Sequence, residues 1–450
     1  MATEPNLLLD ALIEQAGLSH AGFAARLNTC GESLGLRYDH ASVARWIRDH
    51  AIPRSPVPSM ICEVLGERLG VRLTLADIGM DRRATAGSNV PLNRAVDQAT
   101  ALWRGDLTRS ADGVATKLLT GSDAVAPVWD WENPPDDRDV SRPGHRPVSM
   151  ADVQRLRAAR DRYQEMYRRV GGVPVRPRIV HLLHSVGGPL LRAAYDNAVG
   201  RDLYRAVGGL AALAGVCAYD ADQQPLAQRH LHHALRLAKA SGDRGFGGYI
   251  VALLATQSLH VGEYRLVVQY AQTALRAAGS QLTPALTADL HTLAAKAYAR
   301  MHDSAGCHEH MRLSEKTAIR IDPHGEPAEV SYVQPGLVEC QHAEALRRLG
   351  DLSTAQTLAE ESVRTLDAIH LRGRVHRLAG LALILTARGD VDRSAHIAGQ
   401  MLDNADGMES GRIRDRVATV VNALKPHAAE PSVAEVLRRY RYHAGYEGVA

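Results

Sequence analysis

The sequence is poor in aromatic residues and in lysine. Aromatic residues make up 4% of the 450 residues, and only two of them, Phe23 and Phe246, are phenylalanine. Leucine, alanine and valine must therefore fill the core, and these residues suit closely packed helices better than sheets. Arginine far outnumbers lysine, a bias that we attribute to a GC-rich genome and not to a function.

The sequence also lacks paired cysteines and long apolar runs. Its odd number of scattered cysteines, without any C-x-x-C, excludes a disulfide framework and favours reduced thiols. Glu4 and Asp10 interrupt any signal peptide, and the longest apolar run, residues 381–386, is too short to span a bilayer. We therefore expect a cytoplasmic protein without a membrane partner. The cysteines are Cys30, Cys62, Cys217, Cys307 and Cys340.

Catalytic and metal-binding motifs are missing as well. There is no nucleophile elbow, P-loop or dinucleotide fingerprint, so we expect neither an enzyme nor a cofactor. The histidine-rich segments HLHHALRL (230–237) and CHEHM (307–311) do not supply four ligands at zinc spacing. We predict that these histidines lie on solvated helix surfaces and that the chain holds no metal.

The balance of charge is nearly neutral. The net charge of the chain is +3, and residues 1–90 carry nine arginines against ten acidic residues, which gives −1. A DNA-binding domain usually has a clear basic excess. Any DNA affinity of this region must therefore come from a few well-placed arginines, presented twice by a dimer.

Residues 18–54 carry the most informative pattern of the chain. LSHAGFAARLN and YDHASVARWIRDHAIPR predict two short helices whose apolar residues face each other, followed by arginines on the open face of the second helix. This pattern predicts a helix-turn-helix with its second helix in a DNA groove. The turn, residues 29–38, is longer than usual, and the alternative is an ordinary four-helix cap on a helical protein.

The exposed face of the second helix supplies the candidate DNA contacts. Ser42, Arg45 and Arg48 lie on this face, and Arg45 is the best candidate for a guanine edge, because a guanidinium pairs bidentately with O6 and N7. The other arginines would contact phosphates and position the protein without specifying sequence. The complete predicted set is His20, Arg26, Arg37, His40, Ser42, Arg45, Arg48 and Arg54.

Composition divides the chain into three parts. Residues 1–83 form the predicted DNA-binding domain, and residues 84–150, rich in Gly, Ser, Asp and Pro, read as a linker with one helix near 91–103. We expect Trp129 and Trp131 to anchor this linker onto the helical body. Residues 151–450 show helix after helix without strand alternation, so the predicted fold class is all-α.

The third part repeats with a period of about 40 residues. ALRRLGDLSTAQTLAEESV (345–363) and LTARGDVDRSAHIAGQML (385–402) each place a small residue, Ala355 and Ser394 or Ala395, where two helices approach closely. The pattern resembles a tetratricopeptide repeat and predicts a superhelix with a concave face; a compact bundle is the alternative. Turns within the pairs are predicted near Asp222, Gly262, Asp303, Gly350 and Gly389, and a ligand groove near Tyr249, Gln257 and His291.

These phrases, with MICEVLGERLGVRLTLADIGM (60–80) and residues 198–244, resemble an actinobacterial family of regulators. In that family a lambda-repressor-like helix-turn-helix precedes a tetratricopeptide-like domain, and members resemble Streptomyces regulators that restrain sporulation and antibiotic production. The architecture also resembles the peptide-pheromone receptors of Gram-positive bacteria. The resemblance implies a transcriptional regulator, with repression as the expected sign.

The sequence thus predicts a homodimeric regulator that binds operator DNA and that a peptide or small-molecule effector controls. A ligand can regulate such a protein only if it binds two arrangements of the DNA-binding heads with different affinity. The alternative, favoured by the neutral charge of residues 1–90, is a helical-repeat scaffold that docks a protein and has no DNA-binding role.

Overall fold

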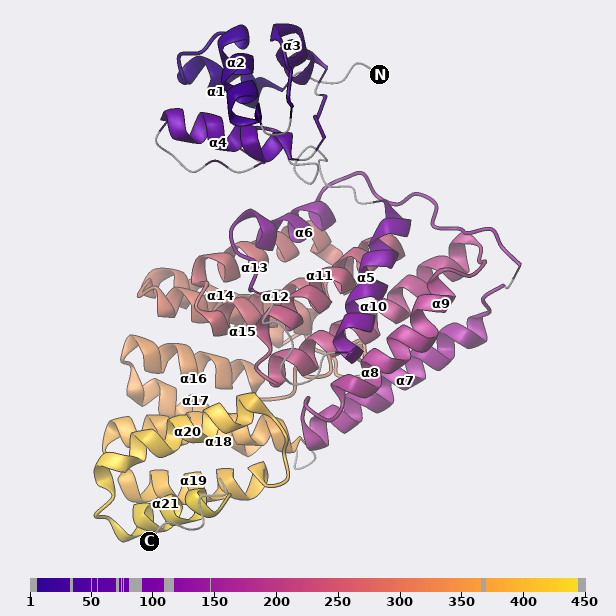
Figure 1. Cartoon of the computed structure of the whole chain (residues 1–450). Coiled ribbons are helices and arrows are strands. Elements are labelled where there is room, and N and C mark those ends of the chain that lie inside the picture. The colour runs from indigo at the N-terminus through magenta and orange to yellow at the C-terminus, as the bar shows by residue number, and fades with distance from the viewer. Residues whose placement is uncertain are drawn as a thin grey trace. The chain divides into compact units, whose positions relative to one another are not determined.

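The computed structural model describes residues 6–32, 35–49, 51–54, 56–69, 73, 75, 77–80, 91–108, 117–145, 147–365 and 370–443. The chain divides into two compact units, unit 1 (residues 1–90) and unit 2 (residues 91–450), whose helices Figure 1 labels. In this described part every regular element is a helix, and two isolated bridges, Arg142 with Tyr195 and Pro147 with Ala194, are the extended pairings. The predicted all-α class is confirmed.

Unit 1 contains four described helices, α1 (Leu7–Gln15), α2 (His20–Cys30), α3 (His40–Arg48) and α4 (Val57–Leu69). Local chemistry sets where the first three begin. The side chains of Asn6, Ser19 and Asp39 accept hydrogen bonds from backbone N–H groups of the first turns of α1, α2 and α3. Gly17, with φ of +67°, follows α1 and turns the chain toward α2. The start of each of these helices is therefore set by the side chain that immediately precedes it.

One apolar core holds the four helices of unit 1 together. Each fully buried Leu, Ile or Phe side chain contributes about 1.5–3 kcal/mol relative to an exposed one. The Asn6 side chain adds a polar tie, because its Nδ2 donates to the carbonyl of Ile78 at 3.0 Å. The largest fully buried side chains of this core are Leu9, Ile13, Phe23, Leu27, Ile61, Leu65, Ile78 and Met80.

The Asn28 side chain of α2 ties down the end of the long turn between α2 and α3. The amide of Asn28 donates to the carbonyl of Tyr38 and accepts from its N–H, both at 2.8 Å. The Tyr38 ring in turn packs edge-on against Trp46 of α3, with 4.9 Å between ring centroids. These contacts fix the entry to α3 although the turn exceeds the usual length.

Unit 2 begins with two helices in the segment that the sequence assigned to a linker with one helix. These are α5 (Leu92–Thr108) and α6 (Ser122–Glu132); residues 84–90, 109–116 and 146 of that segment lie outside the described residues. Both helices pack on the body of unit 2, α5 against α8 and α11, and α6 against α11 and α13. The segment therefore contributes to the main core of the unit, which the predicted linker would not.

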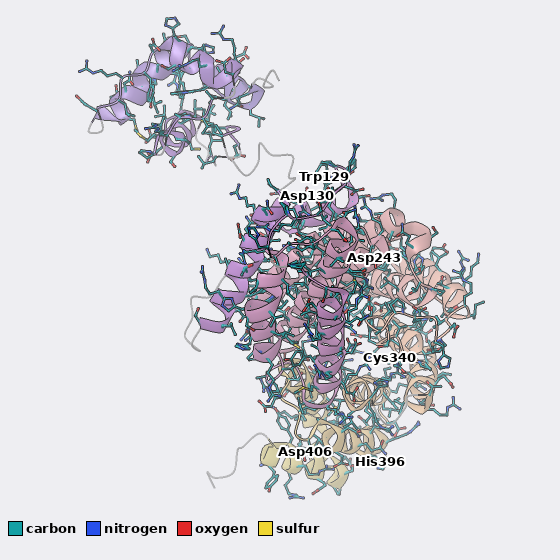
Figure 2. The ribbon with its side chains drawn as sticks, turned by 90° about the vertical axis from the view of Figure 1, so that its right-hand side faces the viewer. Trp129, Asp130, Asp243, Cys340, His396 and Asp406 are labelled. Carbon is teal, nitrogen blue, oxygen red and sulfur yellow. The ribbon has the colours of Figure 1, made fainter. Side chains whose placement is uncertain are left out.

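Trp131 anchors α6, whereas Trp129 does not. Trp131 is 1% exposed and lies so close to Gly247 that a Cβ there would sit 2.0 Å from the indole Nε1. Trp129 is 51% exposed, and Figure 2 labels it beside Asp130. The expected anchoring role thus falls on Trp131 alone. Its contact is available only because residue 247 is glycine.

Twelve helices of the described part of unit 2 form six consecutive pairs, preceded by α7 (Met150–Val170), α8 (Arg176–Leu182), the π-helix η2 (Leu183–Gly187) and α9 (Gly188–Leu191). The pairs are α10 (Asn197–Asp220) with α11 (Gln224–Ser241), α12 (Arg244–Val261) with α13 (Tyr264–Ala278), α14 (Pro284–Arg300) with α15 (Ser304–Ala318), α16 (Leu337–Leu349) with α17 (Leu352–Thr365), α18 (Leu371–Arg388) with α19 (Val391–Ala405), and α20 (Gly411–Leu424) with α21 (Pro431–His443).

A residue with positive φ stands in the turn of each of the first five pairs. These residues are Asp222, Gly262, His302, Gly350 and Gly389, with φ between +60° and +94°. The left-handed conformation ends the first helix and reverses the chain into the second. The turns predicted at these places are confirmed.

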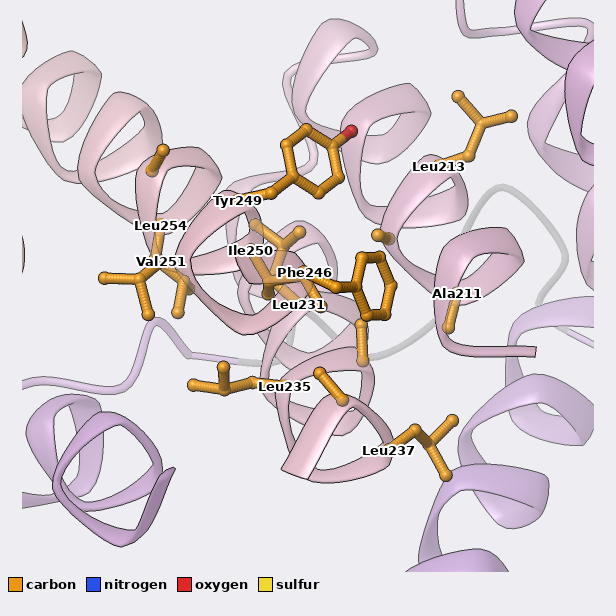
Figure 3. Close-up of a cluster of buried hydrophobic side chains, with 14 of the residues drawn as sticks. Ala211, Leu213, Leu231, Leu235, Leu237, Phe246, Tyr249, Ile250, Val251 and Leu254 are labelled. Carbon is orange, nitrogen blue, oxygen red and sulfur yellow. The ribbon is translucent and has the colours of Figure 1, made fainter. Parts of the chain in front are cut away.

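Small and branched apolar residues pack the pairs against one another. Figure 3 shows part of the largest core, to which Leu213 of α10, Leu231 and Leu235 of α11, and Ile250 of α12 belong. Ala355 and Ser394, the predicted small residues, are fully buried, and the Ser394 hydroxyl donates to the carbonyl of Ala382 at 2.8 Å. The close helix approach expected at these two positions is present.

The beginning and the end of the series of pairs are joined at one buried carboxylate. Asp220, at the end of α10, is fully buried and accepts from the Gly172 N–H at 2.8 Å and from the Ser410 hydroxyl at 2.8 Å. It also forms an ion pair with Arg372 of α18. In a simple solenoid each repeat contacts only its neighbours. Here the first pair contacts the last two, so unit 2 closes on itself.

Candidate functional site

The first candidate surface is the open face of α3. Val43, Trp46 and Ile47 are buried in the core of unit 1, and this fixes the rotation of the helix about its axis. Arg45 and Arg48 consequently lie on the opposite face, and both are exposed. No ion pair or hydrogen bond holds either guanidinium among the described residues, so both remain available to an outside partner.

Ser42 has a role at the start of α3 that the sequence did not reveal. Its N–H and its hydroxyl both donate to Asp39 Oδ1, each at 2.8 Å. The hydrogen bonds from Ser42 hold the pKa of Asp39 below its usual range. The hydroxyl proton of Ser42 is therefore committed to the cap, and an outside group would find the hydroxyl oxygen only as an acceptor.

The remaining predicted DNA contacts surround α3. Arg26 on α2, Arg37 in the turn, His40 at the start of α3 and Arg54 after it are exposed. His20, at the start of α2, is half-buried, and its Nε2 lies 3.2 Å from Asp10 Oδ1. A phosphate would have to compete with Asp10 for His20.

The second candidate surface is a cavity of about 460 Å³ in unit 2. It is lined by the first helices of all six pairs, α10, α12, α14, α16, α18 and α20, and by α7. The side chains on α14 follow helical spacing, with Asp289, Leu293, Lys296 and Arg300 on one stripe. The volume lies within the range of small-molecule sites, about 300–1,000 Å³.

The three residues predicted for a ligand groove lie outside this lining. Tyr249 is buried in the core beside Phe246, where Figure 3 labels it, and Gln257 is buried with its Nε2 donating to the carbonyl of Gln224 at 2.6 Å. His291 is half-buried with its Nδ1 3.1 Å from Nδ1 of His310. The neighbouring positions Thr256 and Asp289 line the cavity instead.

His230 and His232 are buried, so the expected solvated surface is wrong for them, whereas His308 of residues 307–311 is exposed as expected. His230 is fully buried, and its Nε2 lies 2.9 Å from Asp106 Oδ2 of α5, which also pairs with Arg176. Burial works to raise the pKa of Asp106, but the bonds from His230 and Arg176 outweigh it and lower the pKa. Burial also lowers the pKa of His232 to about 3.

This ionic cluster ties α5 to the helical pairs, and its members are far apart in the sequence.

Among the described residues, no three His, Cys, Asp or Glu side chains gather in a way that could hold a metal ion. None of the helices described is long and apolar enough to cross a membrane.

Comparison with known proteins bears on unit 1. The family model described as the SP15 N-terminal domain matches residues 9–81. That range contains α2, α3 and α4, most of α1, and all eight predicted DNA-contacting residues. No curated protein matches the chain. The matched residues all lie in unit 1, so unit 1 is a domain that recurs in other proteins.

Proposed function

We propose that the chain is a sequence-specific DNA-binding transcriptional regulator of the helix-turn-helix class. In this proposal α3 lies in the major groove, Arg45 pairs with a guanine, and Arg48 lies one turn further along the same face. The observation that carries it is the division of α3 into a buried apolar face and an open face with two exposed guanidiniums that no described residue pairs. An Arg–guanine pair contributes about 1–3 kcal/mol of discrimination against the wrong base.

Exposed groups around α3 support the same orientation. Arg26, Arg37, His40 and Arg54 are exposed and come from α2, from the loops on either side of α3 and from the first residue of α3. In this arrangement they would contact phosphates on either side of the groove and set the register of α3. His20, held by Asp10, would join them only after that contact is exchanged.

The proposed active form is a homodimer. Residues 1–90 carry a net charge of −1, so bulk attraction to the phosphate backbone is absent. A single module of this size also buries too little surface to reach specific affinity at ordinary salt. Two copies of α3 on one operator supply the missing contacts.

We assign the six helix pairs of unit 2 to a tetratricopeptide-like superhelix that mediates dimerisation and receives an effector. The support is the uniform use of the first helix of every pair to line one cavity. Repression of development or secondary metabolism is the sign that the family resemblance implies. For the effector to regulate DNA binding, it must bind one arrangement of the two DNA-binding heads more tightly than another.

The experiment is genome-wide recovery of bound DNA with wild type, Arg45→Ala and a control, Arg94→Ala, which removes an exposed arginine from α5 in unit 2. We expect discrete peaks for wild type and the control and their loss for Arg45→Ala, with an unchanged circular dichroism spectrum. Absence of discrete peaks for the wild-type protein would refute the proposal.

A second function is a protein-interaction scaffold in which unit 1 docks a protein. The near-neutral charge of residues 1–90 favours it. It predicts that DNA recovery stays at its background level for both wild type and Arg45→Ala. It also predicts that Arg45→Ala captures one protein partner more weakly than wild type does. The same set of variants therefore separates the two functions.

A further inference from the structure

The lining of the unit 2 cavity has a large excess of positive charge. Among the described residues it contains seven cationic side chains against two carboxylates, Asp289 and Glu344. Two further carboxylates lie next to the lining, Asp220 against Arg372 and Asp222 at 3.3 Å from the ring of His260. The cations come from α7, α14, α18 and α20, so they surround the cavity. They are Arg168, Lys296, Arg300, Arg372, Arg377, Arg412 and Arg416.

Glu344 is shared by more cations than it can neutralise. Its carboxylate pairs with Lys296 Nζ at 2.8 Å and with Arg300 at 3.3 Å, and Arg416 lies 4.0 Å away. Burial disfavours the charged form of Glu344, but these cations outweigh it and hold its pKa well below the usual range. One negative charge thus faces three positive charges on this side of the cavity.

Three further guanidiniums have no carboxylate within ion-pair distance in the described part of the chain. Arg168 donates to the Ser331 hydroxyl at 2.6 Å, Arg377 donates to the carbonyls of Pro335 and Ser362, and Arg412 donates to the ring of His260. Burial lowers the pKa of both Arg168 and Arg377 and outweighs the opposing effects of Glu165 on Arg168 and of Cys340 and Glu339 on Arg377. Uncompensated buried charge is costly and is normally paired with an opposite charge.

The guanidiniums are also held in fixed orientations. Arg372 lies over the ring of Tyr167 at 5.1 Å, and Arg412 lies over the ring of Tyr219 at 4.9 Å. Nε of Arg412 and Nε of Arg416 are buried without a hydrogen-bond partner among the described residues. A planar guanidinium fixed in this way is suited to bidentate binding of a phosphate. A buried polar atom without a partner in turn calls for an absent one.

We propose that this cavity binds a phosphorylated small molecule of nucleotide size and that this ligand is the effector. A phosphate group carries up to two charges and three acceptor oxygens on one centre, so it can engage several guanidiniums at once. An extended peptide spreads its charge along a chain and would need a longer groove than a cavity of about 460 Å³. The inference rests on the proposed function only for the effector role, not for binding.

Binding is tested by titration calorimetry on the full chain at about 150 mM salt, the physiological range in which exposed charges are screened. The probes are pyrophosphate, ADP, adenosine, citrate and tetraglutamate. We expect saturable one-to-one binding of pyrophosphate and ADP, at least tenfold weaker binding of citrate and tetraglutamate, and none of adenosine. Binding of citrate as tight as that of pyrophosphate would overturn the phosphate preference, and tighter binding of tetraglutamate would overturn the small-molecule class.

Variants then locate the site. Arg412→Gln should weaken ADP binding about 10- to 100-fold, the range expected for a lost charge-assisted hydrogen bond. Arg412→Lys should weaken it less, since the charge remains. The matched control is Arg393→Gln on α19, whose partner is Glu360 on the outer helices. Equal effects of Arg412→Gln and Arg393→Gln would exclude this cavity, and circular dichroism checks the fold of each variant.

The effector role is separated from DNA binding itself. Arg45→Ala should abolish operator binding and leave ADP binding unchanged. Arg412→Gln should weaken ADP binding and leave operator binding in the absence of ligand unchanged. In wild type, a saturating bound ligand should shift operator affinity by at least about fivefold, the lower end of ordinary coupling. Ligand binding without any such shift would overturn the effector role and leave the proposed DNA-binding function intact.

Discussion

The two units hold their arginines in opposite ways. On α3, Arg45 and Arg48 are exposed and have no partner in the described part of unit 1. In the cavity of unit 2, Arg372 and Arg412 lie over tyrosine rings, and Asp220 or His260 fixes their ends. Free side chains adapt to a large partner, whereas fixed ones suit a small ligand whose own atoms cannot rearrange.

This difference shows which supporting residues each candidate surface depends on. Unit 1 must keep α3 in place, and its arginines can move. Unit 2 must keep the closure at Asp220 intact, because that contact positions a cavity arginine and joins the first pair to the last. Substitutions in the supporting residues should therefore affect the two units separately and by different amounts.

The largest expected effect is that of Asp220→Asn. The change leaves Arg372 without its buried carboxylate and places an amide N–H donor near the Gly172 N–H. Breaking a buried ion pair from one side costs about 3–5 kcal/mol. We expect scanning calorimetry to show a lowered unfolding transition of unit 2 and an unchanged transition of unit 1.

The control for that change is Asp97→Asn, which removes a 67% exposed partner of Arg192. Surface pairs contribute about 0–1 kcal/mol, so this variant should unfold nearly like wild type. An Asp220→Asn protein as stable as the control would mean that the closure of unit 2 does not depend on this carboxylate.

Next in size is Asn28→Ala in unit 1. The substitution removes both bonds to Tyr38, and partly buried groups that lose their partner cost about 1–3 kcal/mol. Hydrogen exchange should rise in α3 and remain unchanged in α10–α20, and operator affinity should fall. Thr29→Ala, one residue away and exposed, should stay within about 0.5 kcal/mol of wild type.

How much of this could be predicted depends on the range of the contacts. The starts of α1, α2 and α3 were predictable because Asn6, Ser19 and Asp39 act within three residues of themselves. Three turns of the pairs were predictable for the same reason, since Gly262, Gly350 and Gly389 favour positive φ. These local signals needed no knowledge of the rest of the chain.

The cavity could not be assigned from spacing alone. Helices of the pairs are buried on more than one side, so a polar residue on α12 can face a neighbouring pair, as Gln257 does, or the cavity, as Thr256 does. The His230–Asp106 contact joins residues 124 positions apart, and no periodicity indicates it. The sequence carries one signal for the cavity, a stripe of charged residues on α14 that includes Lys296 and Arg300.

Acid should affect unit 2 through its buried histidines. The pKa of His232 is lowered to about 3 by burial, from about 6.5 in the unfolded chain. Between these values the unfolded state binds more protons, so stability is present above pH 6.5 and is lost as pH falls below it. From pH 7 to pH 5 this group alone should cost about 2 kcal/mol.

The measurement is urea unfolding of unit 2 at both pH values, followed by circular dichroism. His232→Leu removes the titrating group, whose Nε2 has no hydrogen-bond partner among the described residues, and should reduce the loss between pH 7 and pH 5. An identical loss in wild type and variant would show that other groups carry the pH dependence.

The smallest expected effect is that of Arg37→Gln in unit 1 on DNA affinity. Arg37 is exposed in the turn before α3, and in the proposed complex it contacts a phosphate without touching a base. Arg37→Gln should therefore weaken binding to operator and unrelated duplexes alike, and reduce the slope of log affinity against log salt by about 0.9. Arg45→Ala, in contrast, should weaken operator binding selectively. Fluorescence anisotropy over a salt series measures both quantities. If Arg37→Gln lost operator discrimination as Arg45→Ala does, the distinction between positioning and base-contacting arginines on this surface would be wrong, and α3 would enter the groove at a different angle.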